Sequence, residues 1–179
     1  MAKRLLIVTS SLRKNSNSDL LADAFAKGAE EAGNSVETVS LKGKEIRYCI
    51  GCLSCQRTGT CVLKDDAVRI AEKAKDADVL AFASPVYYYS ISGQLKTLLD
   101  RLNPLFPSDY RFRDVYFLSA AYEDGEAVFE GSVTAIRGWV DCFSRARLAG
   151  TVFAGGAGAP GEVRGQEALA KARELGRTI

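Results

Sequence analysis

Short runs of consecutive apolar residues alternate along the chain with segments of helical periodicity, and this alternation restricts the fold more than any other feature. Residues 5–8 and most of residues 78–83 are apolar at successive positions, which is typical of strands buried on both faces of a parallel sheet. The segments between such runs repeat apolar residues with the period of amphipathic helices. The pattern predicts strands at residues 5–8, 35–41, 78–83, 115–121 and 151–154, a helix capped by Asp65, and helices at residues 18–32, 93–102, 128–143 and 167–175.

This order of elements indicates one layered domain. Parallel strands joined through helices close with right-handed crossovers, so the alternation places helices on both faces of a single sheet. We therefore expect an α/β, flavodoxin-like three-layer sandwich with a five-stranded parallel sheet of order 2-1-3-4-5, spanning residues 1–179. Residues 42–64 interrupt the pattern and are predicted to form a cysteine-rich loop. Ligands of such folds bind at the carboxyl ends of strands 1 and 3.

Composition excludes several classes of function. The chain contains no histidine, which excludes Ser-His-Asp catalysis, histidine-ligated zinc and an imidazole proton shuttle. Its formal net charge is +2, a balance that gives no reason to expect nucleic acid or a membrane as partner. The apolar run after Lys3 and Arg4 is shorter than the core of a signal peptide, and no run reaches the length of a membrane span. We therefore expect a cytoplasmic protein.

The loop after the first strand is rich in hydrogen-bond donors and leads directly into a helix. Residues Ser10 to Ser18 read SSLRKNSNS. Hydroxyl and amide groups, free backbone N–H groups and the positive end of the helix dipole together suit a phosphate, and Arg13 could add a charge-assisted contact. The glycine patterns of dinucleotide and Walker loops are absent from this loop, so we predict a phosphate monoester. The alternative is a polar loop in which Ser18 only caps the helix.

Aromatic residues follow the third strand. Tyr87, Tyr88 and Tyr89 come directly after Pro85 and Val86, and three consecutive rings in the predicted crevice could lie against a planar ligand. A subunit interface is the alternative location for these rings. After the fourth strand, a third rim is predicted at Ser119, Ala120 and Tyr122. A phosphate monoester joined to a flat heteroaromatic ring describes FMN, which we predict as the cofactor.

Four of the five cysteines form a cluster with the spacing C-x2-C-x2-C-x5-C, at Cys49, Cys52, Cys55 and Cys61. Structural zinc sites usually pair two knuckles over a longer separation. Three thiolates two residues apart, with a fourth close behind, suit a [4Fe–4S] cluster better. Zinc and reduced thiols without a metal remain as alternatives. The fifth cysteine, Cys142, lies beside Trp139 and Phe143 and is expected in the core.

A glycine-rich segment occurs near the end of the chain, where residues 156–161 match G-x-G-x-x-G. This match follows the last predicted strand, and too little chain remains for the next strand and acidic residue of a dinucleotide-binding unit. We therefore expect a surface loop that covers the site.

Taken together, these motifs resemble the iron-sulfur flavoproteins, within the NADPH-dependent FMN reductase and flavodoxin-like superfamily. The resemblance is carried by the cysteine spacing and by residues 11–18, 64–66, 85–87 and 94–101. It implies FMN, a homodimer or homotetramer, and electron transfer from a reduced donor. It also implies that residues 85–89 lie along the ribityl chain and ring, that the four clustered cysteines bind a cluster, and that the phosphate is held by Ser11, Arg13, Ser16, Asn17 and Ser18. Ser10 stands where relatives usually have glycine, and would tighten the turn or add a phosphate contact.

Three functions are compatible with this sequence. The first is an FMN-dependent oxidoreductase that passes electrons from NAD(P)H, with or without a [4Fe–4S] cluster, to a quinone, flavin, metal or protein acceptor. No side chain has to act as a base in that chemistry, which agrees with the absence of histidine. The second is a non-catalytic electron carrier, which the net charge of +2 disfavours because such carriers are usually strongly acidic. The third is a redox or metal sensor built on the cysteine loop.

Overall fold

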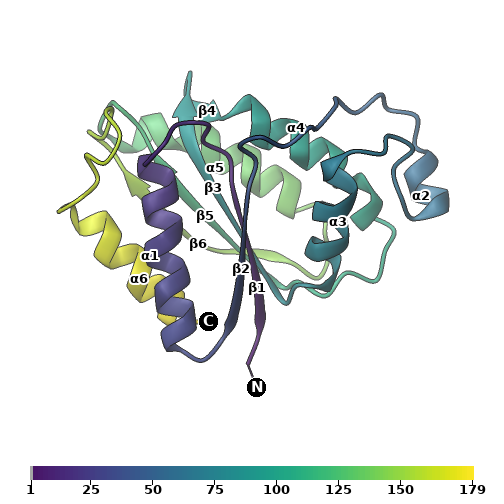
Figure 1. Ribbon diagram of the computed structural model, residues 1–179, viewed down its shortest axis with the longest axis horizontal. Coiled ribbons are helices and arrows are strands. Elements are labelled where there is room, and N and C mark those ends of the chain that lie inside the picture. The colour runs from purple at the N-terminus through teal and green to yellow at the C-terminus, as the bar shows by residue number, and fades with distance from the viewer. Residues whose placement is uncertain (1) are drawn as a thin grey trace.

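The central element of the fold is a parallel sheet between two layers of helices, as the computed structural model of residues 2–179 shows (Figure 1). The strand order is β2-β1-β3-β5-β6, and the short β4 pairs antiparallel with the end of β3. Because β4 has only two residues, the remaining strands give the predicted order 2-1-3-4-5, and the flavodoxin-like prediction is confirmed. The strands are β1 Arg4–Thr9, β2 Ser35–Ser40, β3 Val79–Tyr87, β4 Ser90–Ile91, β5 Asp114–Ala120 and β6 Arg147–Ala154.

The helices cover the two faces unequally. Phe25 of α1 and Ala172 of α6 belong to the core on one face, whereas Ile70 of α3, Leu98 of α4 and Ile136 of α5 belong to the core on the other (Figure 1). Two short elements in the neighbourhood of the cysteines, α2 and the 3-10 helix η1, were not predicted. The helices are α1 Asn17–Glu31, α2 Ser54–Thr58, α3 Asp66–Asp76, α4 Gly93–Arg101, η1 Asn103–Leu105, α5 Glu126–Val140 and α6 Glu167–Arg177.

Local sequence explains where three of these helices begin. Ser16, Asp65 and Ser92 stand at the N-caps of α1, α3 and α4, and each side chain accepts a hydrogen bond from a backbone N–H of the first turn. Such a cap stabilises a helix by about 1 kcal/mol. Two of these caps, Ser16 and Ser92, lie at the carboxyl edge of the sheet, where the site is expected.

Helix α1, which follows the predicted phosphate loop, is held in place by close packing against α6. A Cβ atom at Gly28 would overlap the carbonyl oxygen of Arg173, and one at Gly176 would overlap that of Phe25. Glu31 adds an ion pair with Arg173 at the far end of the two helices. The glycines therefore let the two backbones touch, which fixes the start of α1 relative to the sheet.

One prediction about the core is wrong. Helix α5 ends at Val140, so Cys142 lies beyond the helix with its thiol exposed to solvent, while its neighbour Phe143 is buried as expected. The chain turns at this point toward β6, and the turn rotates Cys142 away from the core. Within residues 2–179, no helix is both long and apolar enough to span a bilayer.

Candidate functional site

Buried serines join the ends of three neighbouring strands at the carboxyl edge of the sheet. Ser10, after β1, donates from its backbone N–H and from its hydroxyl to the carbonyl of Ala83, over 2.9 and 3.1 Å. The Ser92 hydroxyl donates to Ser10 over 2.9 Å. The Ser119 hydroxyl of β5 donates to the carbonyl of Ser84 over 2.7 Å. This network fixes the three loops relative to each other, and it uses the Ser10 hydroxyl inside the protein, which favours the turn-tightening role for that residue.

The loop after β1 presents unpaired backbone donors. In residues 2–179, no protein acceptor pairs with the backbone N–H groups of Ser11, Leu12, Lys14, Asn15, Asn17 and Ser18. Asn15 has a left-handed backbone with φ of 54°. A left-handed residue among right-handed ones curls successive N–H groups into a concavity that binds anions. The loop runs directly into the N-terminus of α1, whose dipole adds positive potential at the same place.

Three serine side chains of this loop are buried beside those donors. Ser11, Ser16 and Ser18 are 2, 4 and 1% exposed. The Ser16 hydroxyl accepts a hydrogen bond from the backbone N–H of Asp19, and it lies 3.4 Å from the hydroxyl of Ser18. Burial with few protein partners leaves hydroxyl hydrogen-bonding capacity for a ligand. These residues therefore form a polar cradle with the donor chemistry for one phosphate.

Asn17 has a different role from the one that the sequence implied. Its side-chain amide donates to the carbonyls of Ala157 and Ala159 over 2.8 and 2.9 Å. Its carbonyl oxygen accepts from the backbone N–H groups of Gly161 and Val163. An amide has two N–H groups and two lone pairs, so its capacity is used completely. The Asn17 side chain fastens the glycine-rich segment, so only the backbone N–H of Asn17 remains available to a ligand.

The glycine-rich segment of residues 155–161 lies against the phosphate loop, as expected for a cover. Besides the Asn17 contacts, the Arg13 guanidinium donates to the carbonyl of Gly158 over 2.8 Å. A Cβ atom at Gly158 would overlap the ring of Tyr122, and one at Gly155 would overlap Asp124. Gly158 of the G-x-G-x-x-G pattern, and Gly155 just before the pattern, thus allow close packing against the loop that follows β5, whereas Gly156 and Gly161 have left-handed backbones.

The tyrosines form an exposed hairpin. Residues Tyr88 and Tyr89 are the two-residue turn between β3 and β4, with left-handed φ angles of 49° and 61°. Such angles are costly for aromatic residues, and strain of this kind concentrates at ligand-binding sites. The Tyr89 hydroxyl donates to Glu123 over 3.0 Å, and this contact raises the pKa of Tyr89. Glycine at position 131 lets α5 approach the Tyr89 carbonyl.

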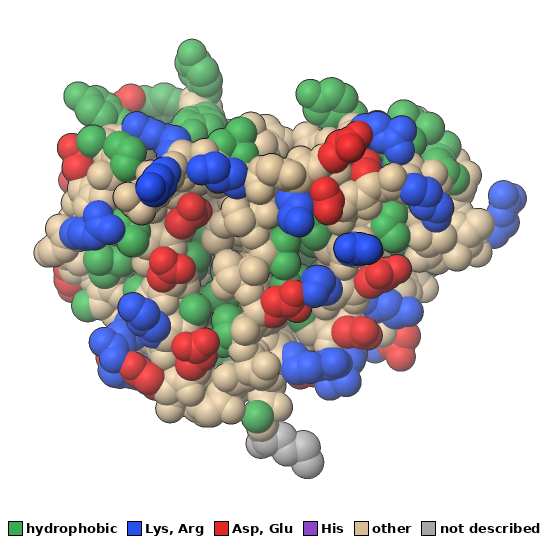
Figure 2. Space-filling view, in the orientation of Figure 1, with side chains coloured by type: hydrophobic (Ala, Val, Ile, Leu, Met, Phe, Trp, Pro, Cys, Tyr) green, Lys and Arg blue, Asp and Glu red, His purple; other side chains and the backbone are tan. Residues whose placement is uncertain are grey.

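Large apolar side chains around this edge are open to solvent. Exposed members are Leu12, Tyr87, Tyr88, Tyr89 and Tyr122, which come from the loops after β1, β3 and β5. Figure 2 shows hydrophobic side chains that project from the upper edge of the molecule, where β4 lies in Figure 1. Of the other predicted residues here, Pro85 and Val86 are half-buried, Ala120 is buried, and Ser119 is buried in the serine network. The edge therefore offers a polar cradle next to aromatic surface.

The four clustered cysteines are divided between two environments. Cys49 and Cys52 are exposed, Cys55 is buried, and Cys61 is intermediate. In the described part of the chain, no three cysteine or acidic residues converge into a metal-binding group. Nitrogen donors nevertheless face two of these sulfurs: Gly51 N–H lies 3.5 Å from Cys49 Sγ, and Asn103 Nδ2 lies 3.3 Å from Cys55 Sγ. The donor chemistry suits iron and sulfide, whereas the segment as folded is open.

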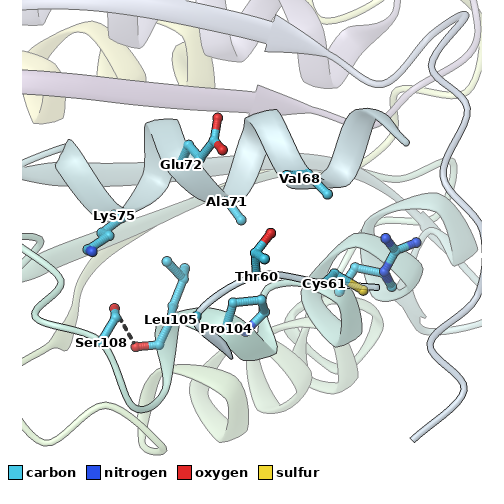
Figure 3. Close-up of a pocket in the computed structure, with 11 residues that line it drawn as sticks. Thr60, Cys61, Val68, Ala71, Glu72, Lys75, Pro104, Leu105 and Ser108 are labelled. Atoms are coloured by element: carbon cyan, nitrogen blue, oxygen red, sulfur yellow. Dashed lines mark hydrogen bonds between the residues drawn. The ribbon is translucent and has the colours of Figure 1, made fainter. Parts of the chain in front are cut away.

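A small cavity adjoins the last of these cysteines. Figure 3 shows Cys61 and Thr60 on one side of it, Val68 and Ala71 of α3 opposite, and Leu105 of η1 below. The cavity measures about 70 Å³, which is far too small for a flavin.

Sequence reasoning missed four residues that organise these regions: Ser84, Ser92, Arg101 and Asn103. The two serines gave no signal, because isolated serines in loops are common. Arg101 did give one, since it follows Leu98 by three residues on the apolar side of α4. A charged residue at that position has to be buried with partners.

The chain is similar to proteins of one known family. The sequence profile of the NADPH-dependent FMN reductase family matches residues 3–137. An iron-sulfur flavoprotein of Archaeoglobus fulgidus is 34% identical over 176 residues, which cover 96% of this chain and 76% of that protein. An iron-sulfur flavoprotein of Methanocaldococcus jannaschii is 38% identical over 102 residues, 57% of this chain and 53% of that protein. The match thus spans only about half the length of this second relative.

Solved structures show the same fold at lower identity. An NAD(P)H:quinone oxidoreductase from Methanothermobacter marburgensis superposes with a TM-score of 0.77 at 22% identity, covering 99% of this chain and 96% of that one. An azoreductase from Bacillus anthracis superposes with a TM-score of 0.73 at 18% identity, covering 99% of this chain and 100% of that one.

Proposed function

The chain belongs to the NADPH-dependent FMN reductase family, and from this premise we propose that it is a flavin oxidoreductase that binds FMN at the carboxyl edge of its sheet. In this proposal NAD(P)H is the electron donor, and the acceptor is a quinone, a flavin, a metal or a protein. The observation that carries the proposal is the set of unpaired N–H groups at Ser11, Leu12, Lys14, Asn15, Asn17 and Ser18, which meets the N-terminus of α1.

The residues of the first loop would hold the phosphate of FMN. Their N–H groups and the hydroxyls of Ser11 and Ser18 are donors, which is what a phosphate dianion requires. Arg13 would contribute long-range attraction, and it would reach the phosphate only by leaving the carbonyl of Gly158. Asp19 lies in the first turn of α1, so its charge affects the binding of an anion at the cradle. Burial raises its pKa, and hydrogen bonds from Ser16 and Thr9 oppose that rise.

The flat ring would lie beside the tyrosine hairpin. Pro85 pairs with Ala120 across β3 and β5, so the two loops leave the sheet side by side. Tyr87, Tyr88, Tyr89 and Tyr122 provide exposed aromatic surface there, and aromatic faces bind planar ligands by area and offset stacking. The serine network beneath holds the loops at a constant spacing, which favours a site that is formed before the ligand arrives.

When bound, FMN would supply the hydride and electron chemistry, which the protein cannot provide with its own side chains. The tasks left to the chain are to bind the phosphate, to orient the ring and to leave one face of it open. The exposed tyrosine edge is suited to alternating access by NAD(P)H and an acceptor. The absence of histidine is no obstacle, since no protein group has to move a proton in this scheme.

We further propose that the protein forms homo-oligomers. Exposed large hydrophobic side chains are found on the cysteine segment and near it: Tyr48, Ile50, Leu53, Val62 and Phe106. Exposed large apolar side chains gathered along one segment are typical of an interaction surface. Light scattering coupled to size-exclusion chromatography tests this directly, and a monomer across the micromolar range would contradict it.

A spectrum and an assay test the function. After incubation with FMN and removal of excess ligand, the protein should retain a flavin absorbance spectrum. The loaded protein should oxidise NADH or NADPH in the presence of a quinone or free flavin. Retention of flavin without any NAD(P)H oxidation would favour the non-catalytic electron carrier. Protein that retains no flavin would refute the proposal as a whole.

A further inference from the structure

The cysteine segment is fastened at its two ends by a single buried arginine. Arg101, with a side chain 0% exposed, makes a bidentate ion pair with Asp65 at 2.8 and 2.9 Å. It also donates to the carbonyl of Arg47, two residues before the first clustered cysteine, and to that of Leu63, two residues after the last. Asp65 in turn accepts from the backbone N–H of Arg47. Arg101 thus closes the neck of the loop that carries all four thiols.

The same arginine keeps one donor free next to a thiol. Its Nε–H is buried and has no partner, although every other N–H direction of the guanidinium points to an oxygen. Cys61 lies beside this guanidinium and shares the small cavity with it. An unpaired buried N–H is costly, and such groups usually await an acceptor. A sulfur that carries more negative charge than a neutral thiol would be that acceptor.

A second residue next to Arg101 faces another thiol. Asn103, at the start of η1, donates from Nδ2 to Cys55 Sγ over 3.3 Å. Arg101 and Asn103 both lie outside the cysteine segment, on the chain that leaves α4. Asn103 holds Cys55 against the fold and Arg101 lies beside Cys61, while Cys49 and Cys52 stay exposed. Two of the four clustered thiols are therefore anchored, and the other two are free.

We propose that Arg101 and Asn103 are positioning residues of a thiolate metal site: they hold Cys61 and Cys55 as a preformed half, onto which Cys49 and Cys52 close when the metal binds. Outer hydrogen bonds of this kind orient ligands, and their loss typically weakens metal binding about 10–100-fold. The four thiols provide the soft donor set that iron, zinc and cobalt accept. This site is independent of the phosphate cradle, so it can fail or succeed without FMN.

Cobalt(II) is the probe that tests this site. Full-length protein with reduced thiols is titrated anaerobically, and thiolate-to-cobalt charge-transfer and ligand-field bands report how many sulfurs bind. The wild type should give bands of a tetrahedral site rich in thiolate. We expect Arg101→Gln to weaken binding about 10–100-fold and Asn103→Ala about 10-fold. Arg101→Lys keeps the positive charge but lacks the planar set of guanidinium N–H donors, so it should recover only part of the lost cobalt affinity.

Two exposed neighbours serve as matched controls. Arg57→Gln removes a guanidinium, and Gln56→Ala an amide, within the same segment, and both side chains lie on its solvent side. Cobalt affinity should change by less than about twofold in these variants, as for other exposed residues. Variants with reduced cobalt affinity should still bind FMN as the wild type does. This separates the metal site from the proposed function.

Two outcomes overturn the proposal. One is a wild type that binds cobalt without thiolate bands. The other is cobalt affinity in the Arg101 and Asn103 variants that equals that of the controls. If Arg101→Gln does not fold, Arg101→Lys and Asn103→Ala decide the matter. Wild-type affinity in folded Asn103→Ala then counts against the proposal, and a loss of affinity and of thiolate bands supports it.

Discussion

The phosphate loop, residues 10–18, and the cysteine segment, residues 42–64, follow adjacent strands and leave the sheet at the same edge, yet they are built in opposite ways. The first has buried serines at both ends and is cross-linked: Ser10 joins β3, and Asn17 fastens the glycine-rich segment. The second is largely exposed and is held mainly at its neck by Arg101.

This difference teaches how the two regions can bind ligands. A loop whose backbone is fixed in advance loses little conformational freedom on binding, so its donors act at nearly full strength. A loop held only at its ends must become ordered when the ligand arrives, and that ordering reduces affinity. We therefore expect FMN binding to depend on single groups in the first region, and metal binding to depend on anchors in the second.

The largest expected effect breaks the phosphate loop. Ser18→Asp places a carboxylate among the N–H donors that would bind the phosphate. Because like charges at such a distance cost several kcal/mol, FMN affinity should fall by at least about 100-fold. Flavin fluorescence during titration measures this, with Ser144→Asp, an exposed serine, as control. Equal FMN affinity in the two variants would mean that the phosphate lies elsewhere.

The next effect concerns the fastening of that loop. Asn17→Ala removes four hydrogen bonds and leaves the backbone groups of residues 157–163 without partners. Unpaired buried groups of this kind cost about 1–3 kcal/mol each before relaxation, so the free energy of unfolding should fall by about 2–4 kcal/mol. Urea denaturation measures it, and Gln56→Ala should change it by less than about 0.5 kcal/mol. A loss as small as the control's would show that the cover is loosely attached.

A thiol-labelling experiment sharpens the contrast inside the cysteine segment. In reduced, metal-free protein, Cys49 and Cys52 should be alkylated as fast as Cys142, which is also exposed. Cys55 should react at least about tenfold more slowly, because its labelling needs local opening. Mass mapping of peptides over time gives the four rates. Uniform rates would show that Asn103 and the fold do not anchor this half of the segment.

The smallest expected effect is a pH dependence at the start of α1. Burial raises the pKa of Asp19 above its ordinary value, and its Oδ1 atom is buried with no partner. Because the pKa of this carboxyl is raised in the folded state, its protonated form stabilises the fold at low pH. This stability is lost as pH rises through the folded-state pKa.

Asp19→Asn cannot ionise, so it should remove this loss of stability at higher pH. At neutral pH the variant should be more stable than the wild type, with a flatter slope of stability between the ordinary pKa of an aspartate and neutral pH. Thermal unfolding across this range provides the check. A variant less stable than the wild type at pH 7 would show that the helix dipole outweighs burial at this position.

Elements with strong local patterns were predictable, whereas long-range polar contacts were not. The apolar runs at residues 5–8 and 79–83 predicted β1 and β3 because burial on both faces leaves no polar position in a strand. The polar run before α1 predicted a loop that ends in a helix cap, and its role in binding a phosphate stays a prediction. Asn17, by contrast, contacts residues about 140 positions away, and no local pattern carries such a pairing.

The glycine-rich segment and Cys142 illustrate the same limit. The sequence predicted a covering surface loop at the glycine-rich segment, but not the contacts of Gly158 with Tyr122 and of Gly155 with Asp124 that hold it in place. Cys142 looks like core because it lies beside apolar residues, but α5 ends two residues earlier and turns it outward. Tertiary packing decided both cases.

Calorimetric titration of the ligand-free protein with FMN and with riboflavin tests the central claim most directly, because the two ligands differ only in the phosphate. Two charge-assisted hydrogen bonds from the preformed N–H groups are worth about 3 kcal/mol, so FMN should bind at least about 100-fold more tightly than riboflavin. Equal affinities for the two ligands would contradict a phosphate cradle in the loop after β1.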